Sequence, residues 1–244
     1  MNELDWKCRT ELLITDAGVE KLRNARVLVV GLGGVGGAAA EQLCRSGIGS
    51  LTLVDNDRVQ ASNINRQIIA LNSTLDKPKC EVITDRLHDI NPDATIKSIN
   101  KFVDADFANE LLTENFDYVI DAIDTLTPKV ELLETCVKKN IPVVSSMGSG
   151  GKVDPTQIKI DDIKKSHHCK FAYIVRKYLH RRGIYEGINV VYSAEEVPEN
   201  AIIETDGSNH KRTIVGTISY MPAIFGAFCA SVVIRDLIKQ DINN

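Results

Sequence analysis

A glycine-rich turn between a short apolar run and a helix-forming segment constrains the fold of this 244-residue chain more than any other feature. The apolar run covers residues 26–30, and Gly31, Gly33 and Gly36 follow it in a G-x-G-x-x-G pattern. Residues 35–46 are rich in alanine and predict a helix. Glycines at these places let the backbone turn tightly and approach a phosphate, which the free N–H groups of the helix then face.

An acidic residue after the next strand supports binding of a nucleotide. We expect the helix to begin near Gly34 and a second strand over residues 50–54, directly before Asp55. The separation of Gly31 and Asp55 is typical of the acid that binds a ribose in this fold. A tight strand-to-helix turn without a ligand is the alternative, because the glycine pattern alone is a weak signal.

The order of the predicted elements favours an α/β fold with a Rossmann-like, doubly wound, mostly parallel sheet. Strands and helices are expected to alternate, with strands at 94–100, 118–121 and 141–145 and helices at 76–89, 105–113 and 128–139. The alternation ends after Gly148, and residues 156–160 have the pattern of an exposed antiparallel strand. We expect a nucleotide-binding core over 1–150 and an antiparallel C-terminal extension over 151–244, packed on the same sheet as one compact domain.

The predicted extension contains a strand at 188–192, a mobile polar loop at 195–212 and a last strand at 213–218. An apolar run at 220–234 follows and ends at two charged residues. It is shorter than the roughly 20 residues that a membrane span requires, so it predicts a buried core helix. A role at a membrane surface is the alternative.

Composition indicates a protein of a reducing compartment. The N-terminus lacks the apolar core of a signal peptide, and the net charge is −4. No two cysteines form a C-x-x-C pair, which argues against a tetrathiolate zinc site and against a disulfide framework. We therefore expect a cytoplasmic protein without zinc. The six cysteines are Cys8, Cys44, Cys80, Cys136, Cys169 and Cys229.

Four short motifs follow the glycine-rich turn in order: V-D-N-D at 54–57, S-N-I-N-R-Q at 62–67, K-P-K at 77–79 and D-A-I-D-T at 121–125. With the turn, they resemble the adenylation motifs of the ubiquitin-activating-like (ThiF/MoeB/HesA) superfamily over almost the whole chain. The resemblance implies a reaction in which a carboxylate attacks the α-phosphorus of ATP to give an acyl-adenylate and pyrophosphate. Cations around the developing charge stabilise that transition state.

The motifs supply candidates for each role in such a reaction. Arg66 and Lys79 are the candidate catalytic cations, although each also fits a surface cation. By resemblance, Asn63 and Gln67 complete the phosphate contacts, and Asp124 binds Mg²⁺, for which one carboxylate with phosphate oxygens suffices. A helix cap is the alternative for Asp124.

Two further candidates complete the set. Asp55 and Asp57 are expected to hold the ribose and its loop, with a merely structural role as the alternative for Asp57. Arg9 stands where the family donates an arginine across a dimer interface, which implies a homodimer.

The second half of the chain bears on which carboxylate is activated. Family members that act on the C-terminal glycine of a sulfur-carrier protein usually carry two C-x-x-C pairs, and this chain has none. The segments at 148–158, 191–195 and 220–226 are more similar to a subfamily without zinc, the tRNA threonylcarbamoyladenosine dehydratases. The resemblance implies that ATP activates the threonyl carboxylate of a modified adenosine beside the anticodon. A nitrogen of the same base then closes a ring and expels AMP.

Some properties of that reaction stay open at this point. No enzyme thioester is required, although Cys229 or Cys169 could serve as a nucleophile. A monovalent cation and a sulfur-transfer protein partner are further open expectations.

A basic segment independently favours an RNA partner. Residues 159–182 carry eight cationic side chains against Asp161 and Asp162, with aromatic residues between them. A solvated amphipathic helix is the alternative. His167 and His168 do not suggest a metal pair, because adjacent residues do not share a helix face. The cationic residues are Lys159, Lys164, Lys165, Lys170, Arg176, Lys177, Arg181 and Arg182.

Three other functions compete with the dehydratase. An adenylyltransferase for a ubiquitin-like sulfur carrier would use a protein tail instead of tRNA. An NAD-dependent oxidoreductase would use the same glycine-rich turn but leaves Asn63, Arg66 and Lys79 unexplained. A nucleotide-binding scaffold for a sulfur-transfer partner would bind ATP without turnover.

Overall fold

A mostly parallel seven-stranded sheet organises the computed structural model, which describes residues 5–204 and 213–239. The strand order is β3-β2-β1-β4-β5-β7-β6, and β6 alone in this sheet runs antiparallel to its neighbour. This confirms the predicted Rossmann-like, doubly wound class. The strands are β1 (Arg26–Val30), β2 (Ser50–Val54), β3 (Thr95–Ile99), β4 (Tyr118–Asp121), β5 (Val143–Ser146), β6 (Ile158–Asp162) and β7 (Asn189–Ser193).

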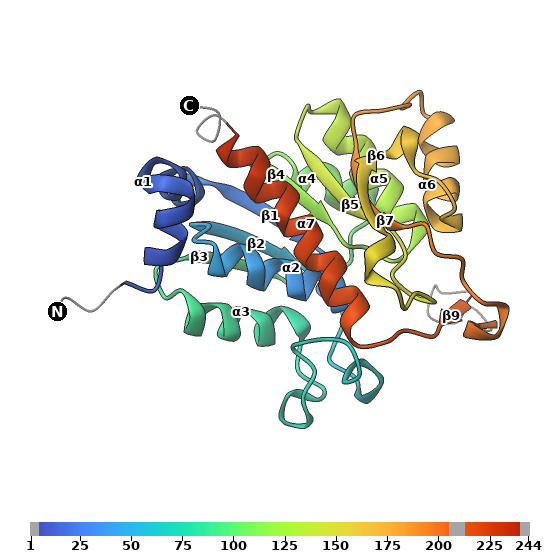
Figure 1. Cartoon of the computed structure of the whole chain (residues 1–244), viewed down its shortest axis with the longest axis horizontal. Coiled ribbons are helices and arrows are strands. Elements are labelled where there is room, and N and C mark those ends of the chain that lie inside the picture. Colours follow the sequence, from blue (N-terminus) through green and yellow to red (C-terminus); the bar gives the residue numbers. More distant parts are fainter. Residues whose placement is uncertain (1–4, 205–212, 240–244) are drawn as a thin grey trace.

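Helices cover both faces of this sheet. The reason is visible in β1, whose side chains are apolar on both faces. Val27 and Val29 join one buried cluster, whereas Leu28 and Val30 join a second, because successive side chains of a strand point to opposite faces. The first cluster includes residues of α1 (Cys8–Asn24), α2 (Gly34–Arg45), α3 (Lys79–Ile90) and α7 (Tyr220–Ile238). The second includes residues of α4 (Ala105–Leu111), α5 (Leu126–Lys138) and α6 (Lys170–His180) (Figure 1).

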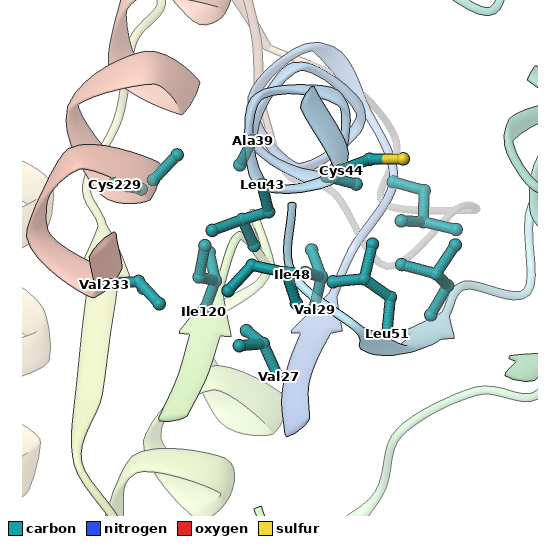
Figure 2. Close-up of a cluster of buried hydrophobic side chains, with 14 of the residues drawn as sticks. Val27, Val29, Ala39, Leu43, Cys44, Ile48, Leu51, Ile120, Cys229 and Val233 are labelled. Carbon is teal, nitrogen blue, oxygen red and sulfur yellow. The ribbon is translucent and has the colours of Figure 1, made fainter. Parts of the chain in front are cut away.

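The apolar C-terminal helix packs directly on the helix of the glycine-rich turn. Within the described residues, α7 is one helix that is long and apolar enough to cross a membrane. In this fold, however, Phe225 and Cys229 of α7 are fully buried. A Cβ atom on Gly226 would lie 2.4 Å from the carbonyl oxygen of Val35, so the two helices approach closely. Figure 2 shows Cys229 and Val233 pointing into the cluster formed by α2 and β1.

The C-terminal extension differs in detail from its sequence prediction. The expected loop at 195–212 is wrong for three residues, because β8 (Ile202–Glu204) pairs with β9 (Thr213–Val215) in a small antiparallel sheet. Residues 205–212 of that predicted loop lie outside the described residues. The strand β7 runs parallel to β5 and thereby extends the main sheet.

Parallel strands place the functional loops together. The carboxyl ends of β1, β2, β4, β5 and β7 meet at one edge of the sheet, which we call the carboxyl edge. The strand order reverses beside β1, whose neighbours are β2 and β4. Ligands of open α/β sheets bind in the crevice at such a reversal.

Candidate active site

The glycine-rich turn has the geometry of an anion site. Gly31 has a φ of +87°, and a Cβ atom on it would lie 2.7 Å from the carbonyl oxygen of Ala122. A Cβ on Gly36 would lie 1.7 Å from the carbonyl oxygen of Gly31, so no side chain fits there. Beside Gly33 the nearest atom would be 3.7 Å away. The first turn of α2, which starts at Gly34, has no side-chain cap and therefore offers N–H groups to an anion.

Asp55 ties this turn to the end of β2. Its Oδ2 accepts a hydrogen bond from the backbone N–H of Leu32 at 2.6 Å, and its Oδ1 accepts one from Asp57 at 2.7 Å. Burial raises the pKa of Asp55, while the charge of Lys79 and the two backbone donors act in the opposite direction. The carboxylate thus fixes the turn, and each oxygen retains acceptor capacity for a ligand hydroxyl.

Lys79 is a buried, paired cation and not a surface lysine. Its side chain is 5% exposed, and its Nζ donates to Oδ2 of Asp57 at 2.8 Å. The backbone N–H of Lys79 also donates to the carbonyl oxygen of Asp57 at 3.0 Å. Asp57 therefore holds both ends of the first residue of α3, which directs the ammonium group toward the end of β2.

The segment 62–67 brings the other motif residues to the same edge. The Oδ1 of Asn63 accepts the backbone N–H of Gln60 at 3.1 Å, and Nη1 of Arg66 donates to Ser62 and Asn65 at 2.8 Å. Gln67 is buried close to Gly33, and its Oε1 has no hydrogen-bond partner within the described part of the chain. Buried polar atoms are rarely left unsatisfied, so this oxygen fits a donor on a bound ligand.

The remaining two predicted residues lie at opposite ends of the sheet. Asp124 is exposed in the loop after β4, at the carboxyl edge. Arg9 is exposed on α1, which leads into the amino end of β1 and lies at the other end of the strands (Figure 1). Within one chain, Arg9 is therefore not brought together with Arg66 and Lys79.

A buried ion pair that the sequence analysis missed lies beneath the carboxyl edge. Asp121, at the end of β4, and Lys129, in α5, are both fully buried. The Nζ of Lys129 donates to Oδ2 of Asp121 at 2.6 Å, to Oγ of Ser145 at 3.1 Å and to the carbonyl oxygen of Ser146 at 3.0 Å. These bonds fasten α5 to β4 and β5. The D-A-I-D-T motif contained the acid, but no sequence signal marked its partner.

A second buried lysine was also missed. Lys152 follows the glycines after β5 and is 2% exposed. Burial lowers the pKa of Lys152, and the fields of Cys169, Glu195 and Glu196 oppose that shift. The position of this lysine directly after Gly150 and Gly151 was its available sequence signal.

Helix α6 presents part of the predicted basic segment on the surface. Tyr173 and Tyr185 are exposed, and the guanidinium of Arg181 lies 5.2 Å from the ring centre of Tyr178. An open groove of about 480 Å³ lies along the helix. Among the described residues, four of the eight cations have hydrogen-bond or ion-pair partners: Arg176 bonds Ser166, Lys159 lies 3.2 Å from His167, and Lys164 and Arg182 pair with glutamates. The groove is lined by Tyr173, Arg176, Lys177, His180, Arg181 and Tyr185.

Comparisons with known proteins show the family to which the chain belongs. The model of the ThiF family matches residues 8–244. The tRNA threonylcarbamoyladenosine dehydratase of Bacillus subtilis is 38% identical over 239 residues, covering 95% of this chain and 94% of that protein. The dehydratase of Haemophilus influenzae is 35% identical, with 93% and 91% covered.

A solved structure extends the agreement to three dimensions. The crystal structure of the E. coli tRNA N6-threonylcarbamoyladenosine dehydratase TcdA in complex with ATP is similar with a TM-score of 0.87 and 32% identity. It covers 97% of this chain and 95% of that one. By contrast, the E. coli sulfur carrier protein ThiS adenylyltransferase is 33% identical over only 63% of this chain.

Proposed function

The chain belongs to the ThiF family, and we propose that it catalyses the ATP-dependent dehydration of N6-threonylcarbamoyladenosine in tRNA, next to the anticodon. The observation that carries this proposal is its similarity to tRNA threonylcarbamoyladenosine dehydratases over nearly the full length of both chains. The match to an adenylyltransferase for a sulfur carrier covers a smaller part of the chain.

The first step joins the threonyl carboxylate to AMP. A carboxylate oxygen bonds to the α-phosphorus of ATP, the bond to the bridging oxygen breaks, and pyrophosphate leaves. Gly33 and the first turn of α2 leave room and N–H groups for the phosphates. Arg66 and Lys79 supply positive charge where negative charge develops, and Asp57 holds Lys79 in place before the reaction starts.

The donor set at the carboxyl edge fits Mg²⁺. Magnesium prefers one or two carboxylates together with phosphate oxygens and water, and Asp124 supplies one exposed carboxylate there. Within the described residues, no group of three or more histidine, cysteine or acidic side chains is placed to hold a metal. When bound, Mg²⁺ would neutralise part of the phosphate charge.

The second step closes a ring. A nitrogen of the same modified base attacks the carbonyl carbon of the acyl-adenylate, its proton is lost, and AMP leaves with the oxygen that came from the carboxylate. The net change in the nucleoside is the loss of one water. Attack within one molecule needs little from the enzyme beyond orientation, because proximity supplies much of the rate.

The exposed cations of α6 suit the tRNA partner. Lys177 and Arg181 line the groove beside Tyr173 and Tyr185, which combines charge for phosphates with rings for stacking bases. Arg176 instead bonds the backbone of Ser166 and anchors the helix. Within the basic segment 159–182, we therefore assign the tRNA contact to the outer face of α6.

A homodimer is the assembly we propose. Leu12 and Leu13 of α1 are 88% and 82% exposed, and they lie one helical turn after Arg9. Such an apolar patch favours burial against another surface. Donation of Arg9 to the partner's phosphate site would account for its distance from Arg66 within one chain. We also propose that the protein acts in the cytoplasm.

The test is AMP release from ATP and Mg²⁺ with fully modified tRNA, and with an unmodified transcript as control. We expect AMP only with modified tRNA, and mass spectrometry of the digested product should find a nucleoside lighter by one water. AMP release that instead requires a carrier-protein tail would establish the adenylyltransferase. ATP binding without AMP release under any of these conditions would favour the scaffold.

A further inference from the structure

Lys152 and Lys129 are both buried at the carboxyl edge, but within the part of the chain that the structure describes they differ in their partners. Lys129 donates to three oxygen atoms, including the carboxylate of Asp121. Lys152 is almost fully buried, with 2% of its surface exposed. Among the described residues, its amine makes neither a hydrogen bond nor an ion pair. The amine itself is not fully buried and keeps some contact with solvent, but burial of the rest of the side chain still disfavours its charged form. Such a group fits an anion that arrives with a ligand.

The neighbouring acids do not neutralise Lys152. The carboxylate of Glu195 accepts the backbone N–H of Val153 at 3.0 Å and that of Asp154 at 2.9 Å. It is therefore used to hold the chain directly after Lys152. Glu196 is exposed to solvent. The backbone next to Lys152 is thus held in place, and the amine of Lys152 remains available to bind a ligand.

A helix N-terminus lies at the same place. Cys169 caps α6 and is among the groups whose field acts on the amine of Lys152. A Cβ atom on Gly148 would lie 3.8 Å from Cβ of Phe171, so the first turn of α6 packs on the loop that carries Lys152. N–H groups of a first helical turn favour anions. The buried lysine and the helix start therefore attract the same kind of ligand.

The proposed reaction has two anionic groups, the phosphates of ATP and the carboxylate of the substrate. The place of Lys152 in the sheet favours the carboxylate as its ligand. The glycine-rich turn follows β1, whereas Lys152 follows β5, two strands away in the sheet and so about 10 Å across it. Arg66, Lys79 and the start of α2 already surround the phosphate position. The β5 side of the carboxyl edge, beyond Asp124, is the side left for the substrate that attacks the α-phosphate.

We propose that the amine of Lys152 and the first turn of α6 bind the carboxylate of the substrate that is to be activated. The identity of this substrate as a threonyl carboxylate rests on the proposed function, but the carboxylate site itself does not. By binding this group, Lys152 selects a substrate with a free carboxylate and holds it beside the nucleotide.

The experiment measures binding without turnover, by calorimetric titration of the full chain. N-carbamoyl-L-threonine is the carboxylate probe, and ATP is the phosphate probe. Lys152→Met should weaken binding of N-carbamoyl-L-threonine about tenfold or more, whereas ATP affinity should stay within about twofold. Lys152→Arg keeps the charge and should restore most of the carboxylate affinity.

The control is Lys138→Met, which removes an exposed lysine from the far end of α5. Thermal unfolding identifies a variant that fails to fold, and Lys152→Gln then takes the place of Lys152→Met. Equal carboxylate affinity in the wild type and the neutral variants would overturn the proposal, as would a loss confined to ATP or a wild type that does not bind the probe. A wild type that binds N-carbamoyl-L-threonine through Lys152 but releases no AMP with modified tRNA would contradict the proposed function alone.

Discussion

The two sides of the carboxyl edge are built differently. On the nucleotide side, Asp55 and Lys79 belong to short sequence motifs, and each is bonded to a residue of a neighbouring loop, 23 and 22 positions away in the chain. On the side of β5 and β7, no motif gave a role to Lys129 or Lys152, and their burial and contacts are seen only in the folded chain. The difference teaches that sequence motifs mark the residues of one half of this site, whereas the buried lysines of the other half are recognised only in the assembled sheet.

The two buried lysines sharpen this comparison, because burial alone does not assign a role. Lys129, with three acceptors, stabilises the fold, whereas Lys152, which has no acceptor among the described residues, is the one we propose for a ligand.

The largest effect is expected at the structural lysine. Lys129→Met leaves the carboxylate of Asp121 buried without its cation, and loss of one partner of a buried ion pair costs about 3–5 kcal/mol. Denaturant unfolding should show this loss of stability. The double variant Asp121→Asn with Lys129→Met removes the unpaired charge and should recover part of it. An unchanged free energy of unfolding in Lys129→Met would contradict a structural role.

Arg66→Ala tests the motif-encoded half. Removal of one group that stabilises transition-state charge typically lowers the rate by about 10²–10³, so AMP formation should almost vanish. The fold should survive, since the side chain of Arg66 donates, within the described residues, to the exposed residues Ser62 and Asn65, and its backbone bond to Asn63 is unchanged by the substitution. Arg23→Ala, on the exposed end of α1, is the control. Normal turnover by Arg66→Ala would show that the phosphate site is assigned wrongly.

Alanine substitutions at Gly36 and Gly33 form a matched pair of tests, one of packing and one of ATP binding. In Gly36→Ala the added Cβ would lie 1.7 Å from a backbone oxygen, and overpacking of this kind typically costs about 1–3 kcal/mol of stability. In Gly33→Ala the nearest atom is 3.7 Å away, so the fold should tolerate it. The new methyl group nevertheless enters the phosphate position and should weaken ATP binding about tenfold. Thermal unfolding and ATP titration together test the pair, and equal stability of the two variants would contradict the close packing of this turn.

The pH dependence should separate Lys152 from its arginine variant. Burial lowers the pKa of Lys152 below its usual 10.5, against the fields of Cys169, Glu195 and Glu196. The cation is therefore lost as pH rises through the lowered pKa, and binding of N-carbamoyl-L-threonine should weaken there. Lys152→Arg keeps its charge and should retain binding at higher pH. Identical alkaline profiles would exclude titration of Lys152 as the cause.

The same shift predicts a change in stability. Between the lowered pKa and 10.5 the unfolded chain binds more protons than the folded chain, so the contribution of Lys152 to stability increases with pH in that window. Lys152→Met should lack this increase in denaturant titrations, which gives a readout independent of any ligand.

The smallest effect is expected on α6. Arg181→Glu and Lys177→Glu should each weaken tRNA binding and lower the slope of log K against log salt by about 0.9 for each phosphate that the variant no longer neutralises. ATP affinity should not change. Lys97→Glu, on the opposite edge strand β3, is the control for charge reversal. Equal salt slopes in the wild type and the α6 variants would place the tRNA elsewhere.

The nucleotide half could be predicted from sequence because its signals are local. The G-x-G-x-x-G pattern gave the turn after β1, and the predicted strand at 118–121 has the bounds of β4. The site roles of Arg66 and Asp124 came from resemblance, and they stay predictions. The predicted loop at 195–212 was wrong at β8, because pairing with β9 satisfies backbone groups that polar composition does not reveal.

The sequence by itself determined the Rossmann-like class, the family and the nucleotide turn, since strand-helix alternation and glycine spacing act over a few residues. Only the tertiary structure decided that, among residues 5–204 and 213–239, Lys129 has ion-pair and hydrogen-bond partners and Lys152 has none. That distinction depends on which acceptors β4, β5 and the chain after β7 bring within about 3 Å of each amine. Burial and pairing of a charge belong to the assembled sheet, and no spacing along the chain encodes them.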